Sequence, residues 1–489
     1  MEKFLVLTLS FGFLLGCHAK RKFDELGFKK SENEESPPAV MDKKEFLFHS
    51  VITDDQYESA LNLPLTIGKK PSIVMIHIDT LRADYVNPTL TPNLHSFSQK
   101  QNTLVFPRTI VGGTATYHSV FSLLHSQSSY KLEPSGRFAK HGSFFIDQLL
   151  GAGYKAHILG NLFYAYKSPY HGCPEDIEIL EKLFTNSFST TFTCHNLREK
   201  VYADSDLKIA DRATELFRSE LKAGMDPRFI FISLEAAHNP YSWDDSIPKV
   251  YTPSQQNEFF RHPLSDPKVN DVVKEELINS YKNAVQSVDY HFGLIMNELD
   301  RLGALDRTIF VVYSDHGERL GEAEKMDWRR WGHGGAPHRE VIEGIVFAHF
   351  PEKLVAHPSR KVSAQLDVIP TLMDYMNFSN YDELRKRKIM AGQSLLRSDS
   401  NCRIGTTPDG ANFPKFLTFD NGTEKAWVTL VFPADENRQG WENSTMSFTH
   451  LTDTDDKPMD SKYKQIPQDE KMDYLEEQFG GCIDLMRRP

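Results

Sequence analysis

The sequence lacks several features that define whole classes of protein. Its 489 residues include only five cysteines, too few for the disulfide scaffold of a small secreted domain. No basic block is longer than a few residues, and 56 lysines and arginines stand against 67 aspartates and glutamates, which gives a net charge of −11. A nucleic-acid partner bound through its phosphates is therefore not expected.

Long uninterrupted apolar runs are also missing. The hydrophobic content of 40% is too high for a disordered chain, yet it is interrupted too often for a protein with many membrane spans. No internal repeat is evident. The length is that of one large domain or two ordinary ones, and it is sufficient to bury a sizeable core.

The first residues, MEKFLVLTLSFGFLLGCHAK, have the pattern of an export signal. Lys3 precedes an apolar run over 4–15 that is too short to span a bilayer comfortably. The run ends in LLGC, which resembles a bacterial lipobox and makes Cys17 the expected lipidation site. The alternative is an ordinary secretory signal cleaved near Ala19. The first reading predicts a membrane-anchored lipoprotein of the bacterial cell envelope, and the second a secreted protein.

Four cysteines remain when Cys17 is set aside, namely Cys173, Cys194, Cys402 and Cys482. An even number of cysteines in an oxidising compartment fits the pairs 173–194 and 402–482. The sequence does not fix this connectivity.

Composition divides the rest of the chain into three parts. Residues 18–66 are charged and interrupted by proline, which indicates a tether leading into the folded protein. Residues 67–380 are expected to form the catalytic domain, and residues 381–489 a smaller subdomain with an antiparallel sheet and a helix. The strands expected in that subdomain are 402–407, 415–420 and 426–432.

Apolar runs alternate with helical patterns through the larger domain. The runs that indicate buried strands are SIVMIHI (72–78), KAHILG (155–160), RFIFISL (228–234), TIFVVYS (308–314) and GIVFAHF (344–350). The segments with helical spacing are 143–152, 206–222 and 274–302. This alternation predicts an α/β sandwich with a largely parallel sheet. Ligands bind such sheets at the carboxyl ends of the strands, so the residues that follow the strands are the first candidates for a functional site.

Acidic residues follow two of these strands. Asp79 comes directly after 72–78, and Asp315-His316 comes directly after 308–314. Taken singly, Asp79 has an alternative as a helix N-cap, and the Asp-His-Gly-Glu stretch as a turn. Together, two carboxylates and an imidazole at strand ends predict a divalent metal site.

A glycine-rich bend supplies a candidate nucleophile. Gly112-Gly113 precedes Thr114 and Thr116, and an apolar helical stretch follows. Backbone N–H groups at a helix start favour a tetrahedral anion, and a metal ion on a hydroxyl lowers its pKa enough to make it a nucleophile. The alternative is that either threonine is only an N-cap.

Two histidines complete the candidate site. His238 follows the strand at 228–234, and His333 lies in the glycine-rich stretch WGHGG. An imidazole there could bind the anionic oxygens of an ester, protonate a leaving group or ligate a second metal ion. Taken alone, a histidine is more often a surface or packing residue than a functional one.

These motifs, in this order, resemble the sulfatase-like branch of the alkaline phosphatase superfamily over about residues 70–380. The stretches that carry the resemblance are IVMIHIDTLRADYV with TPNL, the long NSYKNAVQSVDYHFGLIMNELDRLGALDRTIFVVYSDHGERLGE, WGHGG, REVIEGIVFAHFP, DVIPTLMDYM and AGQSLL. The resemblance implies an alkaline phosphatase-like sandwich, with a large mixed central sheet flanked by helices and a smaller C-terminal α+β subdomain. It also implies Asp79, Asp315 and His316 as metal ligands.

The chain departs from the sulfatase pattern at the nucleophile. Sulfatases carry a C/S-x-P-S-R motif whose first residue becomes formylglycine, and aligning SLL (122–124) on the family places Thr116 at that position. Threonine cannot form that aldehyde. The lysine and histidine of the family's G-K-W-H are also replaced, in Gly160-Asn161-Leu162-Phe163.

Thr116 is instead similar to the second threonine in the Gly-Thr-x-Thr motif of phosphoethanolamine transferases, which is their nucleophile. His238 and His333 match the histidines that flank the substrate in those enzymes. The resemblance implies that Thr116 is a metal ligand and forms a covalent phospho-threonine, and that Thr114, His238 and His333 contact the substrate. One divalent ion is expected, with Zn²⁺ as the first choice and Mn²⁺, Mg²⁺ or Ca²⁺ as alternatives.

The sequence therefore predicts a metal-dependent hydrolase or transferase that acts on a phosphate or sulfate ester, such as a lipid head group or an envelope glycan. One alternative is a divergent sulfatase that cleaves sulfate esters. Another is a non-catalytic surface lipoprotein that retains the fold. Contact with a membrane is expected through the lipid anchor, and the oligomeric state is left open.

Overall fold

A computed structural model describes most of the chain. The described residues are 39–40, 54–129, 142–160, 192–196, 202–222, 224–256, 271–321, 331–334, 338–358, 360–397, 402–406, 415–431, 445–467 and 470–486. The expected export signal with Cys17, the cysteine at position 173 and Asn161-Leu162-Phe163 lie outside them.

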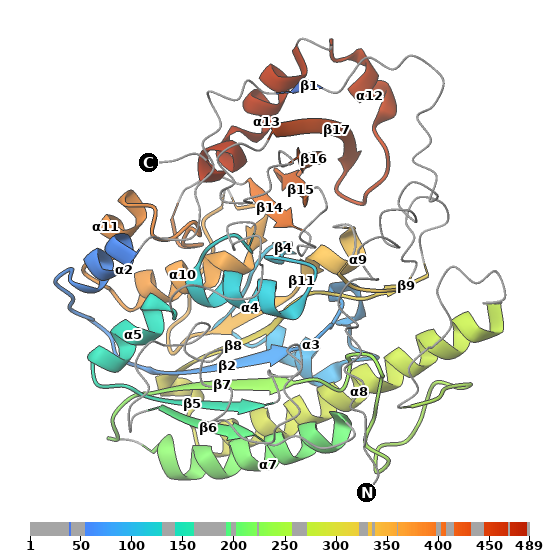
Figure 1. Cartoon of the computed structure of the whole chain (residues 1–489). Helices are drawn as coiled ribbons and strands as arrows, with labels where there is room; N and C mark the ends of the chain where they lie inside the picture. Colours follow the sequence, from blue (N-terminus) through green and yellow to red (C-terminus); the bar gives the residue numbers. More distant parts are fainter. Residues whose placement is uncertain are drawn as a thin grey trace, which may run out of the picture. The chain divides into compact units, whose positions relative to one another are not determined.

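A seven-stranded mixed sheet forms the centre of the protein (Figure 1). Its strands, in spatial order, are β3 (Thr103–Val105), β12 (Val346–His349), β8 (Thr308–Ser314), β2 (Ser72–Ile78), β7 (Arg228–Leu234), β5 (Lys155–Gly160) and β6 (Phe192–Asn196). The five strands from β8 to β6 run parallel. Strand β12 runs antiparallel to its two neighbours β8 and β3, so β3 has the same direction as the other five. The predicted α/β sandwich is confirmed, with four of its five expected strands at the predicted bounds and β12 shorter at both ends.

Helices cover both faces of this sheet (Figure 1). One face packs against α4 (Thr116–His125), α5 (Phe144–Gly151) and α10 (Val368–Tyr375), and the other against α3 (Pro92–Ser98), α7 (Tyr202–Glu220) and α8 (Asp271–Arg301). Alternate residues of β2 divide between the two layers: Ile73 and Met75 join the first core, and Val74 and Ile76 the second. This accounts for the continuous apolar run of the strand, because both of its faces are buried. No helix of the described residues is long and apolar enough to cross a membrane.

Short elements connect the layers. They are α2 (Asp54–Leu61), η1 (Ala83–Tyr85), η4 (Leu305–Arg307), α9 (Arg339–Ile342), η5 (Gln365–Asp367), α11 (Tyr381–Lys386), a β9–β10 pair (Arg319–Leu320, Trp331–Gly332) and a small sheet of β11 (Glu343–Gly344), β4 (Thr109–Ile110) and β13 (Ser363–Ala364). Helix α2 falls within the segment predicted to be a tether. Its Tyr57 and Ala60 are buried in the core beside α5, so the folded part extends N-terminal of residue 67.

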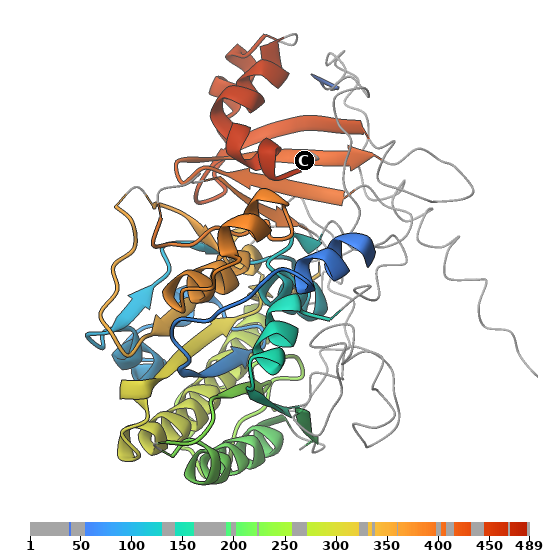
Figure 2. The same ribbon diagram turned by 90° about the vertical axis from the view of Figure 1, so that its left-hand side faces the viewer.

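The C-terminal part contains a second, antiparallel sheet (Figure 2). Its strands, in spatial order, are β1 (Ala39–Val40), β17 (Thr445–Asp453), β16 (Glu424–Val431), β15 (Lys415–Asp420) and β14 (Arg403–Thr406), with helices α12 (Asp460–Gln465) and α13 (Lys471–Met486). The antiparallel sheet with a helix was predicted from the sequence, whereas β17 and β1 were not. Strand β1 comes from the expected tether and pairs with β17, about 400 residues later in the chain.

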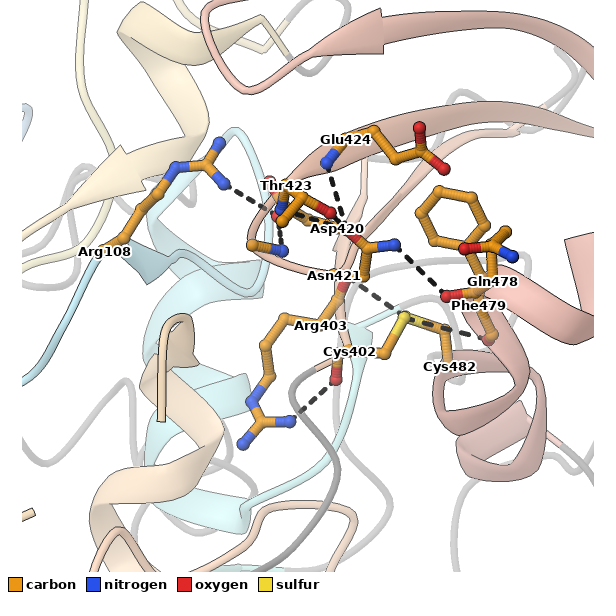
Figure 3. Close-up of a disulfide and its surroundings, with 11 residues drawn as sticks. Arg108, Cys402, Arg403, Asp420, Asn421, Thr423, Glu424, Gln478, Phe479 and Cys482 are labelled. Carbon is orange, nitrogen blue, oxygen red and sulfur yellow. Dashed lines mark hydrogen bonds and ion pairs between the residues drawn. A yellow bond between two sulfur atoms is a disulfide. The ribbon is translucent and has the colours of Figure 1, made fainter. Parts of the chain in front are cut away.

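A disulfide joins Cys402, next to β14, to Cys482 in α13 (Figure 3). This confirms one of the two pairs that the cysteine count suggested. Arg403, the next residue, extends its guanidinium out of the subdomain and forms a buried ion pair with Asp367 of η5, with 2.7 Å between Nε and Oδ2. Arg108 makes a similar connection to Asp420 at 2.7 Å (Figure 3). The C-terminal sheet is thus joined to the main domain by two ion pairs whose carboxylates are buried.

Candidate active site

Three carboxylates lie in a row across the central sheet. Asp79, Glu235 and Asp315 each follow the last residue of their parallel strands β2, β7 and β8, and all three are buried. The strand ends are in register, because Ile78 pairs with both Leu234 and Ser314. The strand-end residues selected from the sequence therefore lie at the same edge of the sheet.

Asp79, Asp315 and His316 form a candidate metal site. One donor atom of each side chain lies within 4.8 Å of the others. Asp315 Oδ1 accepts hydrogen bonds from the backbone N–H of Thr80 at 2.9 Å and of His316 at 2.7 Å. Its Oδ2 and the Oδ1 of Asp79 are buried without a hydrogen bond from the described residues. Buried oxygens of this kind are rare unless an ion or water completes them.

The imidazole of His316 is oriented for the same site. Its Nδ1–H donates to the carbonyl oxygen of Gly317 at 2.9 Å, which leaves the lone pair of Nε2 as the donor toward an ion. Nε2 lies 3.3 Å from Asp315 Oδ2. Burial lowers the pKa of His316 to about 4, so the ring is neutral near pH 7.

Electrostatics also favour a cation at this position. Burial and the neighbouring carboxylates of Asp315 and Glu235 raise the pKa of Asp79 well above its usual value. Burial alone would raise the pKa of Asp315 too, but His316 and His77 lower it. Neither carboxylate has an ion pair with lysine or arginine among the described residues. Two oxygen donors and one imidazole fit a divalent ion such as zinc or manganese.

The candidate nucleophile lies beside these donors. Thr116 is the first residue of α4 and is half-buried, and its Oγ1 is 3.4 Å from His316 Nε2. The hydroxyl is therefore within reach of an ion held by the three donors, as the glycine-rich bend and the strand ends together predicted. Substrate can also reach it, because the side chain is not fully enclosed.

The loop before Thr116 is held at successive residues. The hydrogen bonds that hold it are Val111 N to Ile342 O (2.8 Å), Ser129 Oγ to Gly112 O (2.5 Å), Ser119 Oγ to Gly113 O (2.7 Å) and Gly334 N to Thr114 O (2.7 Å). A Cβ on Gly112 would lie 2.0 Å from the Ser122 Cβ, which explains the glycine there. Thr114 is fully buried; its predicted substrate contact stays a prediction.

The two flanking histidines also converge on the site. The ring centroid of His333 lies 4.4 Å from that of His316 and 5.1 Å from that of His238. His238 Nδ1–H donates to the Asn239 carbonyl oxygen at 2.6 Å. Burial, together with the neighbouring His333, lowers the pKa of His238 to about 4, so this imidazole is neutral near pH 7 and its other nitrogen can accept a proton.

Glu318 is a site residue that sequence reasoning did not assign. It is fully buried, and its carboxylate oxygens lie 3.3 and 3.4 Å from His333 Nδ1. Burial raises the pKa of Glu318 to about 7. The carboxyl group fixes the orientation of the His333 ring. A signal was present, because Glu318 closes the same Asp-His-Gly-Glu stretch.

Glu235 and His77 were missed for different reasons. Glu235 obeys the strand-end rule that located Asp79, and Asp206 accepts hydrogen bonds from the backbone N–H of Glu235 and Ala236 at 2.8 and 2.9 Å. His77 lies inside strand β2, with its Nε2 3.4 Å from Asp315 Oδ2. An imidazole in a buried apolar strand was the available signal.

A largely parallel sheet with candidate metal donors at its carboxyl edge and a hydroxyl at a helix start is the arrangement implied by the resemblance to the alkaline phosphatase superfamily. A sequence profile of the Sulfatase family matches residues 71–378. The chain therefore belongs to the Sulfatase family.

Individual relatives are distant. An arylsulfatase of Clostridium perfringens is 24% identical over 241 residues, which is 42% of this chain and 47% of that protein, so the match spans about half of the relative. A phosphonate monoester hydrolase of Agrobacterium radiobacter has a similar fold, with a TM-score of 0.59, 16% identity, and coverage of 85% and 96% of the two chains. An alkaline phosphatase superfamily protein of Vibrio parahaemolyticus has a TM-score of 0.50 and 14% identity, with coverage of 87% of this chain and 90% of that chain.

Proposed function

We propose that the protein is a metal-dependent hydrolase or transferase that cleaves a phosphate ester with Thr116 as its nucleophile. The observation that carries this proposal is the 3.4 Å distance between Thr116 Oγ1 and His316 Nε2, beside the buried oxygens of Asp79 and Asp315. A divalent ion held by Asp79, Asp315 and His316 would lower the pKa of a nearby hydroxyl and neutralise charge on an ester.

In the first step, Thr116 Oγ forms a bond to phosphorus and loses its proton to solvent. The bond between phosphorus and the alcohol oxygen breaks with its electron pair on that oxygen. His333, oriented by Glu318, gives the departing oxygen a proton. The product of this step is a phospho-threonine at position 116 together with the free alcohol.

In the second step, a water molecule or an acceptor alcohol attacks the same phosphorus. His238 is neutral near pH 7 and takes the proton of the incoming oxygen. The bond from phosphorus to Thr116 Oγ breaks with its electron pair on that oxygen, which takes a proton from solvent. His238 then releases its proton to solvent and His333 regains one from solvent, so the enzyme returns to its starting state. Attack by water is hydrolysis, and attack by an alcohol is group transfer, so the same residues support both reactions.

Sulfate-ester hydrolysis is the second candidate function. Family membership and the match to an arylsulfatase favour it. Threonine at position 116 favours phosphate, because the usual sulfatase nucleophile is an aldehyde hydrate that threonine cannot form. The likeness to a phosphonate monoester hydrolase does not distinguish phosphate from sulfate esters, because at 16% identity it shows only a shared fold.

The test is a panel of substrates with and without metal. Purified protein supplied with Zn²⁺ or Mn²⁺ is assayed on p-nitrophenyl phosphate, bis-p-nitrophenyl phosphate and p-nitrophenyl sulfate, and Thr116→Ala is the matched variant. Turnover of a phosphate ester that Thr116→Ala abolishes supports the proposal. Turnover of the sulfate alone assigns the protein to sulfate esters. The remaining outcome is a protein that binds metal but turns over none of these esters and no ester in crude envelope fractions. That outcome supports a non-catalytic binding lipoprotein.

We propose further that the protein is exported and anchored through lipid on Cys17. The disulfide between Cys402 and Cys482 supports export, because such bonds persist in oxidising compartments. Expression with labelled palmitate, followed by detergent phase separation, tests the anchor. Label on the wild type and none on Cys17→Ser supports it, and an unlabelled wild type in the aqueous phase indicates secretion.

A further inference from the structure

Gln365 lies between the two halves of the candidate site. It is the first residue of η5 and is fully buried. Its side-chain Nε2 donates to the carbonyl oxygens of Ser314 at 2.6 Å and of Asp315 at 2.8 Å. Its Oε1 accepts from the backbone N–H of Gly112 at 3.0 Å. One carboxamide therefore binds both the metal-ligand segment and the nucleophile loop.

Two of these backbone groups, the carbonyls of Ser314 and Asp315, lie where the pairing of β8 with β12 has ended. Strand β12 pairs with β8 only as far as Val346, opposite Tyr313, so the carbonyls of Ser314 and Asp315 lie beyond the ladder. Gly112 lies in the bend before α4, and its buried N–H donates to the carboxamide oxygen of Gln365. Buried backbone groups without partners are costly. Only a side chain with a donor at one corner and an acceptor at the other satisfies all three groups.

The bonds set the position of the nucleophile relative to the ligands. Gly112 precedes Thr116 by four residues, and Asp315 and His316 are two of the three donors of the candidate metal site. The two segments are about 200 residues apart in the sequence, and the carboxamide of Gln365 joins them directly. A displacement of about 1 Å between reacting groups can lower a rate by about 100-fold.

Gln365 is itself held from the C-terminal subdomain. Asp367 Oδ2 accepts the backbone N–H of Ala364 at 2.9 Å and pairs with Arg403 Nε at 2.7 Å, and its Oδ1 accepts the N–H of Gln393 at 2.8 Å. Both ends of η5 are therefore fixed before Gln365 reaches the site. This support makes the carboxamide a rigid connector.

We propose that Gln365 is a positioning residue that aligns the Thr116 hydroxyl with Asp315 and His316. This proposal rests on the proposed function, because it concerns the alignment of that nucleophile with that ion. It differs from a purely structural role, in which Gln365 would only satisfy buried backbone groups and its loss would lower stability alone.

Two substitutions separate these roles. Gln365→Glu keeps the acceptor for Gly112 but places a carboxylate oxygen against two carbonyls, and Gln365→Met keeps the shape and loses all three bonds. Gln127→Met is the matched control, because Gln127 is also buried and donates to a backbone carbonyl, that of Ile389 at 2.8 Å, outside the site. A purely structural role predicts lower stability in these variants and an unchanged kcat per folded molecule.

The experiment uses the full-length protein with Co²⁺ or Zn²⁺. For each variant, kcat and KM are measured on the best ester of the panel, and the thermal unfolding curve gives the folded fraction at the assay temperature. The visible absorption of bound Co²⁺ reports ligand geometry. We expect kcat to fall about 100-fold in both Gln365 variants, with a much smaller change in KM. The Gln127→Met enzyme should keep the wild-type kcat and spectrum.

A kcat loss in the Gln365 variants beyond that of Gln127→Met, at equal folded fraction, supports the positioning role. A shifted Co²⁺ spectrum then locates the displacement at Asp315, and an unchanged spectrum locates it at the Thr116 loop. Equal kcat in all three variants overturns the role and leaves the proposed function intact. If the wild type binds Co²⁺ but turns over no ester, an altered spectrum in the Gln365 variants alone supports the role, and a uniform spectrum overturns it. A wild type that binds no ion removes both proposals.

Discussion

Two regions of this molecule hold buried carboxylates whose partners differ in kind. Where the C-terminal sheet meets the main domain, Asp367 pairs with Arg403, and Asp420 with Arg108, each at 2.7 Å. At the carboxyl edge of the central sheet, Asp79 and Asp315 have no such partner among the described residues. The acids of both regions are almost completely removed from water.

This difference in partners distinguishes carboxylates that form structural ion pairs from carboxylates that are candidate metal ligands. A buried carboxylate needs a counter-charge. At the junction of the C-terminal sheet with the main domain, an arginine supplies it for each of these two acids. The strand-end region instead brings several acids together, an arrangement that favours a bound cation, or a proton on Asp79 when no cation is bound. Removing an acid should therefore have opposite consequences in the two regions.

The largest expected effect tests the strand-end region through its hydroxyl. Thr116→Ala leaves every carboxylate and imidazole in place, and we expect turnover to fall by about 10⁴-fold or more, because loss of a nucleophile removes the covalent route. Thr116→Ser keeps a hydroxyl and is the control. Steady-state assays and metal analysis on the same samples measure both properties. If Thr116→Ala retained both its metal and wild-type turnover, the assignment of Thr116 as the nucleophile would be contradicted.

The next effect tests the C-terminal region. Arg403→Met leaves Asp367 as a buried carboxylate without its counter-charge, and we expect the free energy of unfolding to fall by about 3–5 kcal/mol. Urea denaturation of the metal-free protein measures it. The matched variant Arg397→Met removes a half-buried arginine that pairs with Asp374, and it should cost less. An equal loss for both variants would show that burial does not distinguish the two pairs.

The disulfide gives a somewhat smaller effect. Replacing both Cys402 and Cys482 by serine opens a link across 80 positions, and we expect a loss of about 2–4 kcal/mol of stability. The candidate metal site is held by other bonds, so metal affinity should not change. Chemical denaturation and metal titration measure the two quantities. Unchanged stability, or metal affinity that falls along with stability, would break the proposed independence of the two regions.

The smallest effect has the opposite sign. In metal-free protein the folded-state pKa of Asp79 is raised, so the native state holds a proton that the unfolded chain has released, and stability falls as pH rises above about 4. Asp79→Asn removes that dependence and should stabilise the apoprotein at pH 7 while weakening metal binding. Unfolding curves at several pH values in EDTA measure this. A destabilised apoprotein at pH 7 would contradict the proposed lack of a counter-charge.

Local patterns were sufficient to predict five of the seven strands of the central sheet and the candidate ligands Asp79 and Asp315. Both faces of β2 and β8 are buried, so their apolar runs mark them clearly, and Asp79 and Asp315 follow at once. The bend before Thr116 was equally visible, since glycine is required where Gly112 approaches Ser122. These features depend on neighbours in the sequence.

Contacts between distant segments could not be predicted in this way. Gln365 reaches Gly112 across 253 positions, and nothing in its neighbourhood distinguishes it from an exposed glutamine. Strand β1 pairs with β17 although its surroundings are charged and rich in proline. Glu318 stood beside a predicted ligand, but its partner His333 depends on how the following loop folds.

The central claim is that Asp79, Asp315 and His316 hold a divalent cation beside Thr116. The most direct test is the metal content of purified wild type and Asp79→Asn, after both are loaded with Zn²⁺ and freed of excess. The account predicts about one tightly bound ion per wild-type chain and a large loss in the variant, which keeps its fold. Equal metal in both proteins, or none in the wild type, would contradict it.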